Sequence, residues 1–229
     1  MTSTQHQVVA ETRIVMADPT ALGVFGLAMV TFVAASQKLG LTSGSAYIVP
    51  WAMFLGSAAQ IWASTVDFKK NNYFGATVLG AYGLFWMAVS MHWAIGQGWL
   101  GTVDPAKADP TQLAYACFGY FIFSIFIMIA SFETNKVFTA ILVLINVLLP
   151  SLGLAILKIE PAIFSPLAAW SELGISLLGF YAAGAKISGL ILRTTKPRDG
   201  SRMLISTRMA AKTLLASKDA IMMKIEKKK

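Results

Sequence analysis

The sequence has few of the residues on which catalysis, metal binding and disulfide cross-linking depend. Among 229 residues it has one cysteine and two histidines, so Cys117 lacks a partner for an intrachain disulfide, and no Cys/His cluster offers a metal site. It also has no phosphate-binding glycine loop, dinucleotide fingerprint or nucleophile elbow. The sequence therefore predicts no catalytic residue, metal or cofactor, and we interpret Cys117 as a small core residue of an apolar helix.

Charge is also scarce. Charged residues make up 13% of the chain and hydrophobic residues 56%, whereas about a quarter of an ordinary soluble domain is charged. Spanning a bilayer core of about 30 Å takes roughly 20 apolar helical residues, and helices satisfy every backbone group within one segment. We therefore predict an all-α polytopic membrane protein with six transmembrane helices in one bundle, over residues 22–37, 47–66, 74–96, 113–132, 137–157 and 167–192.

Six spans place both termini on one side of the membrane. The loops on the opposite side hold only three basic residues, Lys38, Lys107 and Lys158, whereas the side of the termini holds Arg13, Lys69, Lys70, Lys136 and the basic residues after Leu192. Because an excess of Lys and Arg marks the cytoplasmic face, we predict a multi-pass protein of the cell (inner) membrane with both termini in the cytoplasm.

The chain divides into a cytoplasmic N-terminal segment (1–16), a transmembrane transport domain (17–193) and a basic tail (194–229). The first segment lacks the apolar stretch of a signal peptide. The tail alternates basic and apolar residues, a pattern typical of an amphipathic helix on the inner leaflet. A basic cluster beside a membrane helix more often binds anionic lipid than nucleic acid, so we predict a lipid partner and no nucleic acid. The alternative is a mobile tail that only enforces topology.

Polar residues recur at helical spacing on one face of three of the predicted spans. Polar side chains inside a bilayer usually face the bundle interior or a wet cavity, which indicates a narrow, weakly polar substrate path. The alternative is that these residues bond across helices and allow close packing. The candidates for the path are Gln60, Ser64, Trp86, Thr139 and Asn146.

Two blocks of the sequence carry recognisable motifs. Residues 17–27 read ADPTALGVFGL, and residues 56–86 contain GSAAQ, DFKKNNYFGAT and AYGLFW in that order. The first block resembles the Asn-Pro-Ala-Pro-Leu-Gly-Leu signature of the acetate uptake transporter family, which includes bacterial succinate–acetate permeases and fungal acetate or ammonium transporters. The second block resembles that family's Gly-Gly-x-x-Gln, Glu-x-x-x-Gly-Asn-Thr-Phe-Gly and Ser-Tyr-Gly-x-Phe-Trp motifs. The resemblance assigns a pore-entrance motif to Asp18, Pro19, Gly23 and Gly26.

The resemblance also implies a hexamer in which each six-helix protomer has its own pore, narrowed by a Phe, a Tyr and a Leu. Matched by position, this constriction falls on Leu27, Tyr82 and Ile145, and only the tyrosine is identical. A leucine in place of the aromatic residue would widen the constriction. Asp18 replaces the signature asparagine, and its carboxylate would repel an anion unless it is protonated or paired.

Together these features predict transport of acetate and similar small monocarboxylates, with succinate as a further candidate. A path with amide and hydroxyl donors and no fixed positive charge would bind such an anion weakly, which lets it leave as well as enter. Proton-coupled symport and channel-like passage both remain open. One alternative is a channel for a neutral solute such as ammonia or urea, and another is a non-transporting membrane scaffold that works through its tail.

Overall fold

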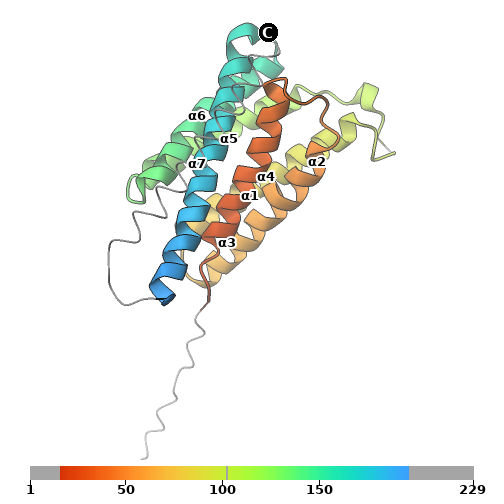
Figure 1. Cartoon of the computed structure of the whole chain (residues 1–229). Coiled ribbons are helices and arrows are strands. Elements are labelled where there is room, and N and C mark those ends of the chain that lie inside the picture. The colour runs from red at the N-terminus through yellow and green to blue at the C-terminus, as the bar shows by residue number, and fades with distance from the viewer. Residues whose placement is uncertain (1–15, 102, 196–229) are drawn as a thin grey trace, which may run out of the picture.

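The computed structural model describes residues 16–101 and 103–195, and this part of the chain consists of helices joined by loops and contains no strand (Figure 1). The predicted N-terminal segment and basic tail therefore lie outside the described residues, apart from Met16 and the last two residues of the final helix. The elements are α1 (Thr20–Lys38), α2 (Ile48–Trp51), η1 (Ala52–Ala59), α3 (Gln60–Lys69), α4 (Tyr73–Gly96), η2 (Pro105–Lys107), α5 (Gln112–Ser131), α6 (Lys136–Ile156) and α7 (Pro161–Thr195).

The chain makes six crossings of bilayer length. Five are single helices, each long and apolar enough to cross a membrane. The remaining crossing, which is the second along the chain, consists of α2, η1 and α3, and these three follow one another without a break. The middle piece is a π-helix, a widened turn that often occurs at functional sites. The six predicted spans are therefore confirmed as helices.

The last span begins earlier than predicted. Helix α7 starts at Pro161 and contains Pro166, whereas the sequence analysis placed its start at residue 167. A proline usually ends or interrupts a helix because it lacks an N–H group and its ring crowds the preceding turn. Pro161 is the first residue of α7, where the missing N–H group costs no intrahelical hydrogen bond. Pro166 lies in the second turn, where it removes one such bond, and the helix continues through it.

Asparagines shape the turns at the end of the bundle where the chain begins. The side-chain oxygen of Asn72 accepts a hydrogen bond from Gly75 N at 3.2 Å and caps α4, and Asn135 caps α6 by accepting from Phe138 N at 2.9 Å. Asn71 has a φ of 57°, in the left-handed region that asparagine tolerates better than most residues. The two caps therefore fix where α4 and α6 begin.

The spans are arranged as a ring. Helix α7 packs along α1 and α6, and α6 packs on α5; on the other side, α1 packs on η1 and α3, which pack on α4. The ring closes where α4 meets α5 over a short stretch. Figure 1 shows the start of α1 and the end of α7 at the same end of the bundle, as six crossings require.

The bundle has an apolar interior and an apolar exterior. Cys117 is fully buried in the core, as predicted. On the outside, Phe54, Trp62, Tyr115 and Phe126 are each 68% exposed. Large apolar side chains on the outer face suit contact with lipid or with neighbouring protomers, because a protein surrounded by water rarely exposes such surface.

We expect the substitution Gly26→Ala to destabilise the bundle. A Cβ atom at Gly26 would overlap the carbonyl oxygen of Leu55 in η1, and backbone cannot yield as a flexible side chain can. Overpacking of this kind costs about 1–3 kcal/mol, so the melting temperature in detergent should fall. Gly119→Ala is the matched control, because nothing lies within 4 Å of a Cβ there. Equal melting temperatures for the two variants would contradict this close approach of α1 to η1.

Candidate functional site

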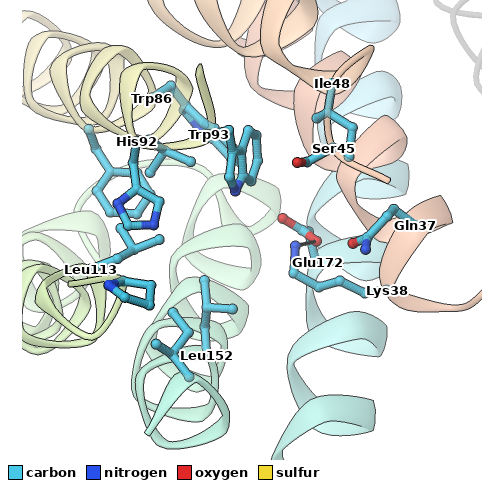
Figure 2. Close-up of a pocket in the computed structure, with 14 residues that line it drawn as sticks. Gln37, Lys38, Ser45, Ile48, Trp86, His92, Trp93, Leu113, Leu152 and Glu172 are labelled. Carbon is cyan, nitrogen blue, oxygen red and sulfur yellow. Dashed lines mark hydrogen bonds and ion pairs between the residues drawn. The ribbon is translucent and has the colours of Figure 1, made fainter. Parts of the chain in front are cut away.

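A cavity of about 310 Å³, here called the outer cavity, opens near the end of α1, at the opposite end of the bundle from the start of α1. Much of its wall is apolar and includes Trp86, Trp93, Leu113 and Leu152 (Figure 2). Its polar side chains are Gln37, Lys38, Ser45, His92 and Glu172.

A buried ion pair forms one side of the outer cavity. Lys38 Nζ, at the end of α1, lies 2.7 Å from Glu172 Oε2 of α7; the side chain of Glu172 is 1% exposed and that of Lys38 is 18% exposed. In Figure 2 these two head groups meet on the side of α1 and α7, with His92 on the other side of the cavity. The predicted absence of fixed positive charge is therefore wrong for this cavity, because α1 extends to Lys38 and carries its ammonium group inward.

Glu172 was not among the predicted site residues, although the sequence carries a signal for it. Glu172 is the only acidic residue within residues 167–192. An ionisable residue inside a membrane span is costly and usually has a partner and a function. Its partner Lys38 is 134 residues away in the chain, so the pairing itself could not be read from local spacing.

An inner cavity adjoins the outer one and shares Phe85 and Trp86 with it. Its volume is only about 20 Å³, close to the minimum of roughly 10–15 Å³ that one water molecule needs. The structure brings the three residues predicted to form a constriction together around this cavity, from α1, α4 and α6: Leu27, Tyr82 and Ile145. We call these three residues the neck.

A short hydrogen-bond network lies beside the neck. The hydroxyl groups of Tyr82 and Ser124 are 2.7 Å apart. Asn146 Nδ2 donates to Ser124 Oγ at 3.1 Å and to the Leu142 carbonyl oxygen at 2.8 Å. Asn146 Oδ1 is buried and has no hydrogen-bond partner in the described part of the chain. The network therefore fixes the Tyr82 ring through its hydroxyl and leaves one acceptor unused next to the neck.

The other residues predicted for the path make contacts within the helix bundle. Gln60 Nε2 donates to the Gly56 carbonyl oxygen of its own span at 2.6 Å. Ser64 Oγ donates to the Ala76 carbonyl oxygen at 2.6 Å, joining α3 to α4, and Thr139 Oγ1 donates to the Ser131 carbonyl oxygen at 2.9 Å, joining α6 to α5. These contacts match the packing alternative. None of the three lines either cavity, whereas Trp86 lines both.

The pore-entrance motif lies at the opposite end of α1. Asp18 accepts hydrogen bonds from the backbone N and hydroxyl of Thr20 at 3.0 and 2.6 Å and pairs with Lys186 Nζ at 2.8 Å. Partial burial raises the pKa of Asp18, but the hydrogen bonds from Lys186 and Thr20 outweigh this and hold that pKa below its ordinary value. The carboxylate is therefore charged and paired, which offsets the repulsion expected from an unpaired one.

The rest of that motif shapes the start of α1. Pro19 is the N-cap residue of the helix. Gly23 and Gly26 are buried, and Gly23 lies where a Cβ atom would crowd Leu79 and Ala63. Small residues here let α1 approach its neighbours closely.

The Asp18–Lys186 pair should persist through mildly acidic pH. The pKa of Asp18 is lowered from 3.8 in the folded protein, so its contribution to stability is present above about pH 4 and is lost only as pH falls through the lowered pKa. We expect Asp18→Asn to lower the melting temperature by the same amount at pH 5 and pH 7. An effect present at pH 7 but absent at pH 5 would contradict the lowered pKa. Thr20→Val removes one hydrogen bond to Asp18 but keeps the Asp18–Lys186 ion pair. This variant therefore controls for the loss of a hydrogen bond alone.

Comparison with known proteins identifies the group to which the chain is related. The model of the GPR1/FUN34/yaaH family matches residues 2–190. The chain is 25% identical over 172 residues to the succinate-acetate/proton symporter SatP of Escherichia coli (strain K12), covering 75% of this chain and 89% of that protein. It is 29% identical over 146 residues to ammonia transport outward protein 2 of Saccharomyces cerevisiae, covering 61% of this chain and 50% of that protein.

Comparison of the fold with solved structures points to the same group of proteins. The solved structure of the bacterial acetate channel SatP superposes with a TM-score of 0.70 and 26% identity, covering 81% of this chain and all of that one. The family match covers most of the chain, and it confirms the resemblance seen in the two motif blocks. This chain is a member of the GPR1/FUN34/yaaH family.

Proposed function

We propose that this protein transports acetate and similar small monocarboxylates across a membrane through a path inside each protomer. The observation that carries the proposal is the neck: Leu27, Tyr82 and Ile145 surround one small apolar cavity at the inner end of a larger one. The names of the bacterial relatives support acetate as the substrate.

The geometry suits selection of small carboxylates by size and polarity. A cavity near the size of one water molecule has no room for acetate, so the neck is closed in this conformation and passage requires its side chains to move. An apolar constriction disfavours hydrated inorganic ions, which would have to lose their water there. The methyl group of acetate can contact the apolar side chains of the neck without cost. Its carboxylate then needs only a transient hydrogen bond to replace water as it passes.

Both modes of passage have support. The Escherichia coli relative is named a proton symporter and the superposed structure a channel. The route proposed here runs from the outer cavity past Trp86 to the neck, beside the Asn146 network. Gln60, Ser64 and Thr139 remain proposed path residues only for a conformation in which their present hydrogen bonds break.

Uptake of labelled acetate into proteoliposomes, measured against protein-free liposomes, tests the proposal. The neutral acid crosses lipid unaided, so the assay should run at pH 8, where acetate is almost entirely anionic. We expect uptake above the lipid background and competition by formate and lactate, with succinate as the test of larger acids. Uptake equal to that of protein-free liposomes would reject acetate transport.

A second candidate is a pathway for ammonia, which the name of the yeast relative favours. The chain spans about half the length of that relative. Ammonia-driven alkalinisation of the same proteoliposomes, without acetate uptake, would support this candidate instead.

We further propose a hexamer in the cell membrane with both termini in the cytoplasm. The exposed apolar residues of the bundle supply surface for contacts between protomers, and the bias of basic residues supports the orientation. Native mass measurement in mild detergent tests assembly: hexamers are expected, and monomers alone would reject it.

Cysteine labelling from outside the cell tests the orientation: it should reach the loop at residues 39–45 but not Asn71. The anionic-lipid partner of the tail remains a proposal from sequence.

A further inference from the structure

The Lys38–Glu172 pair differs from the other ion pairs of the described residues. Three such pairs form within residues 16–101 and 103–195, and only in this one is the carboxylate buried. It also lies on the wall of the outer cavity, whose volume of about 310 Å³ leaves space for a small acid beside it. The Lys38 side chain is 18% exposed, so a solute in the cavity can reach the ammonium side of the pair although Glu172 itself is buried.

Lys38 is suited to recognise a carboxylate. Its ammonium group has three donors, and Glu172 Oε2 takes one of them at 2.7 Å. A charge-assisted hydrogen bond to an anion is about twice as strong as a neutral one. The other two donors can bind an entering carboxylate, which then competes with Glu172 for the same positive charge.

Charge balance determines what happens to Glu172 when an anion binds. The resting pair is neutral, and an added anion would leave one uncompensated negative charge beside a side chain that is 1% exposed. A charge without a partner in such a site is strongly unfavourable. A proton on Glu172 removes this charge, so that the occupied site is again neutral.

We propose that the outer cavity is a carboxylate-binding site in which the substrate anion replaces Glu172 at the ammonium group of Lys38 and the displaced Glu172 takes up a proton. The exchange consumes one anion and one proton from solution and breaks no covalent bond of the substrate. Release toward the neck reverses it, because Glu172 loses the proton and pairs with Lys38 again. This inference rests on the proposed function and specifies the first binding step of that path.

Few other groups can supply or take the proton at this site. Among the residues that line the cavity, the titratable ones are Lys38 from α1, His92 from α4 and Glu172 itself. Helix α6, which packs along α7, carries none between residues 137 and 156, and α2 and η1 carry none. Helix α5 contributes only Leu113. The Cys117 thiol of α5 interacts with the charge of Lys38, but it is fully buried and does not line the cavity. Among the lining residues His92 is therefore the competing proton acceptor, and it provides the control.

Acetate binding to the full chain in detergent tests the inference. Calorimetric titration at pH 7 in two buffers of different ionisation enthalpy counts the protons taken up per acetate. Linkage predicts about one proton per acetate and an apparent Kd that rises about tenfold per pH unit above neutrality. Glu172→Gln keeps a hydrogen-bond acceptor for Lys38, so it should bind acetate with no proton uptake and with a Kd independent of pH. His92→Gln should keep the uptake of about one proton per acetate, whatever its effect on the Kd.

The outcomes separate this inference from the proposed function. Proton uptake that survives in folded Glu172→Gln, or that is lost in His92→Gln, would overturn the assignment. If Glu172→Gln does not fold, the neutral double variant Lys38→Gln/Glu172→Gln replaces it, and proton-linked acetate binding by that variant would equally overturn it. Acetate transport by the unsubstituted protein without linked proton uptake rejects the inference and leaves the proposed function standing. No acetate transport at all rejects both.

Discussion

Replacing Tyr82 or Ile145 by alanine is expected to let longer monocarboxylates through the protein. Both side chains line the inner cavity of about 20 Å³, so truncating either one widens the neck. One methylene in an apolar pocket is worth about 1–3 kcal/mol, a factor of roughly 10–200 in discrimination. The ratio of butyrate to acetate uptake by proteoliposomes should therefore rise at least about tenfold.

Two further variants distinguish the effect of the width of the neck from the effect of the Tyr82 hydroxyl group. Tyr82→Phe keeps the ring and removes only the hydroxyl that meets Ser124 at 2.7 Å, so the ratio should stay close to that of the unsubstituted protein. Leu27→Phe adds bulk from α1 and should lower the ratio. A folded Tyr82→Ala protein with an unchanged ratio would place size selection elsewhere on the path.

The substitution Lys38→Met is expected to cause the largest loss of stability. It removes the partner of a carboxylate that is 1% exposed, so Glu172 must either stay charged without a partner or take up a proton at pH 7, and either costs stability. Breaking a buried pair in this way costs about 3–5 kcal/mol. We expect a clear fall in the detergent melting temperature at pH 7, with the helical circular dichroism signal retained below the transition.

A second substitution distinguishes lost pairing from lost packing. In Lys38→Met/Glu172→Met the charge is gone from both sides, and replacing a buried pair with apolar residues is often neutral or stabilising. The double variant should therefore recover most of the melting temperature that Lys38→Met loses. A double variant that is less stable than Lys38→Met would show that packing, and not charge, dominates at this position.

The helices were predictable because long apolar stretches between charged loops leave the chain no other structure in a bilayer. All six spans could be placed in this way. The π-helix within residues 52–59 was not predicted; in the fold η1 packs closely against Gly26 of α1, and the Trp86 side chain lies beside Gly56. Such tertiary contacts leave no periodic signal in the sequence.

The site was partly predictable. Helical spacing correctly indicated that Gln60 and Ser64 face inward, since both are buried, but spacing gives the face of a helix and not the partner. The carbonyl groups that these side chains contact became visible only in three dimensions. The neck residues came from the resemblance to a family, and the structure gathers them around one cavity. Glu172 was overlooked because its partner lies on a helix at the other end of the chain.

Chemical block of the neck tests the central claim most directly. In a Cys117→Ala background, Ile145→Cys places a single thiol on the inner cavity, and a small methanethiosulfonate reagent can add to it. The account predicts that labelled acetate uptake falls to the level of protein-free liposomes in proportion to modification, and that saturating acetate slows the modification. Complete modification, verified by mass measurement, with undiminished acetate uptake would contradict a path through Leu27, Tyr82 and Ile145.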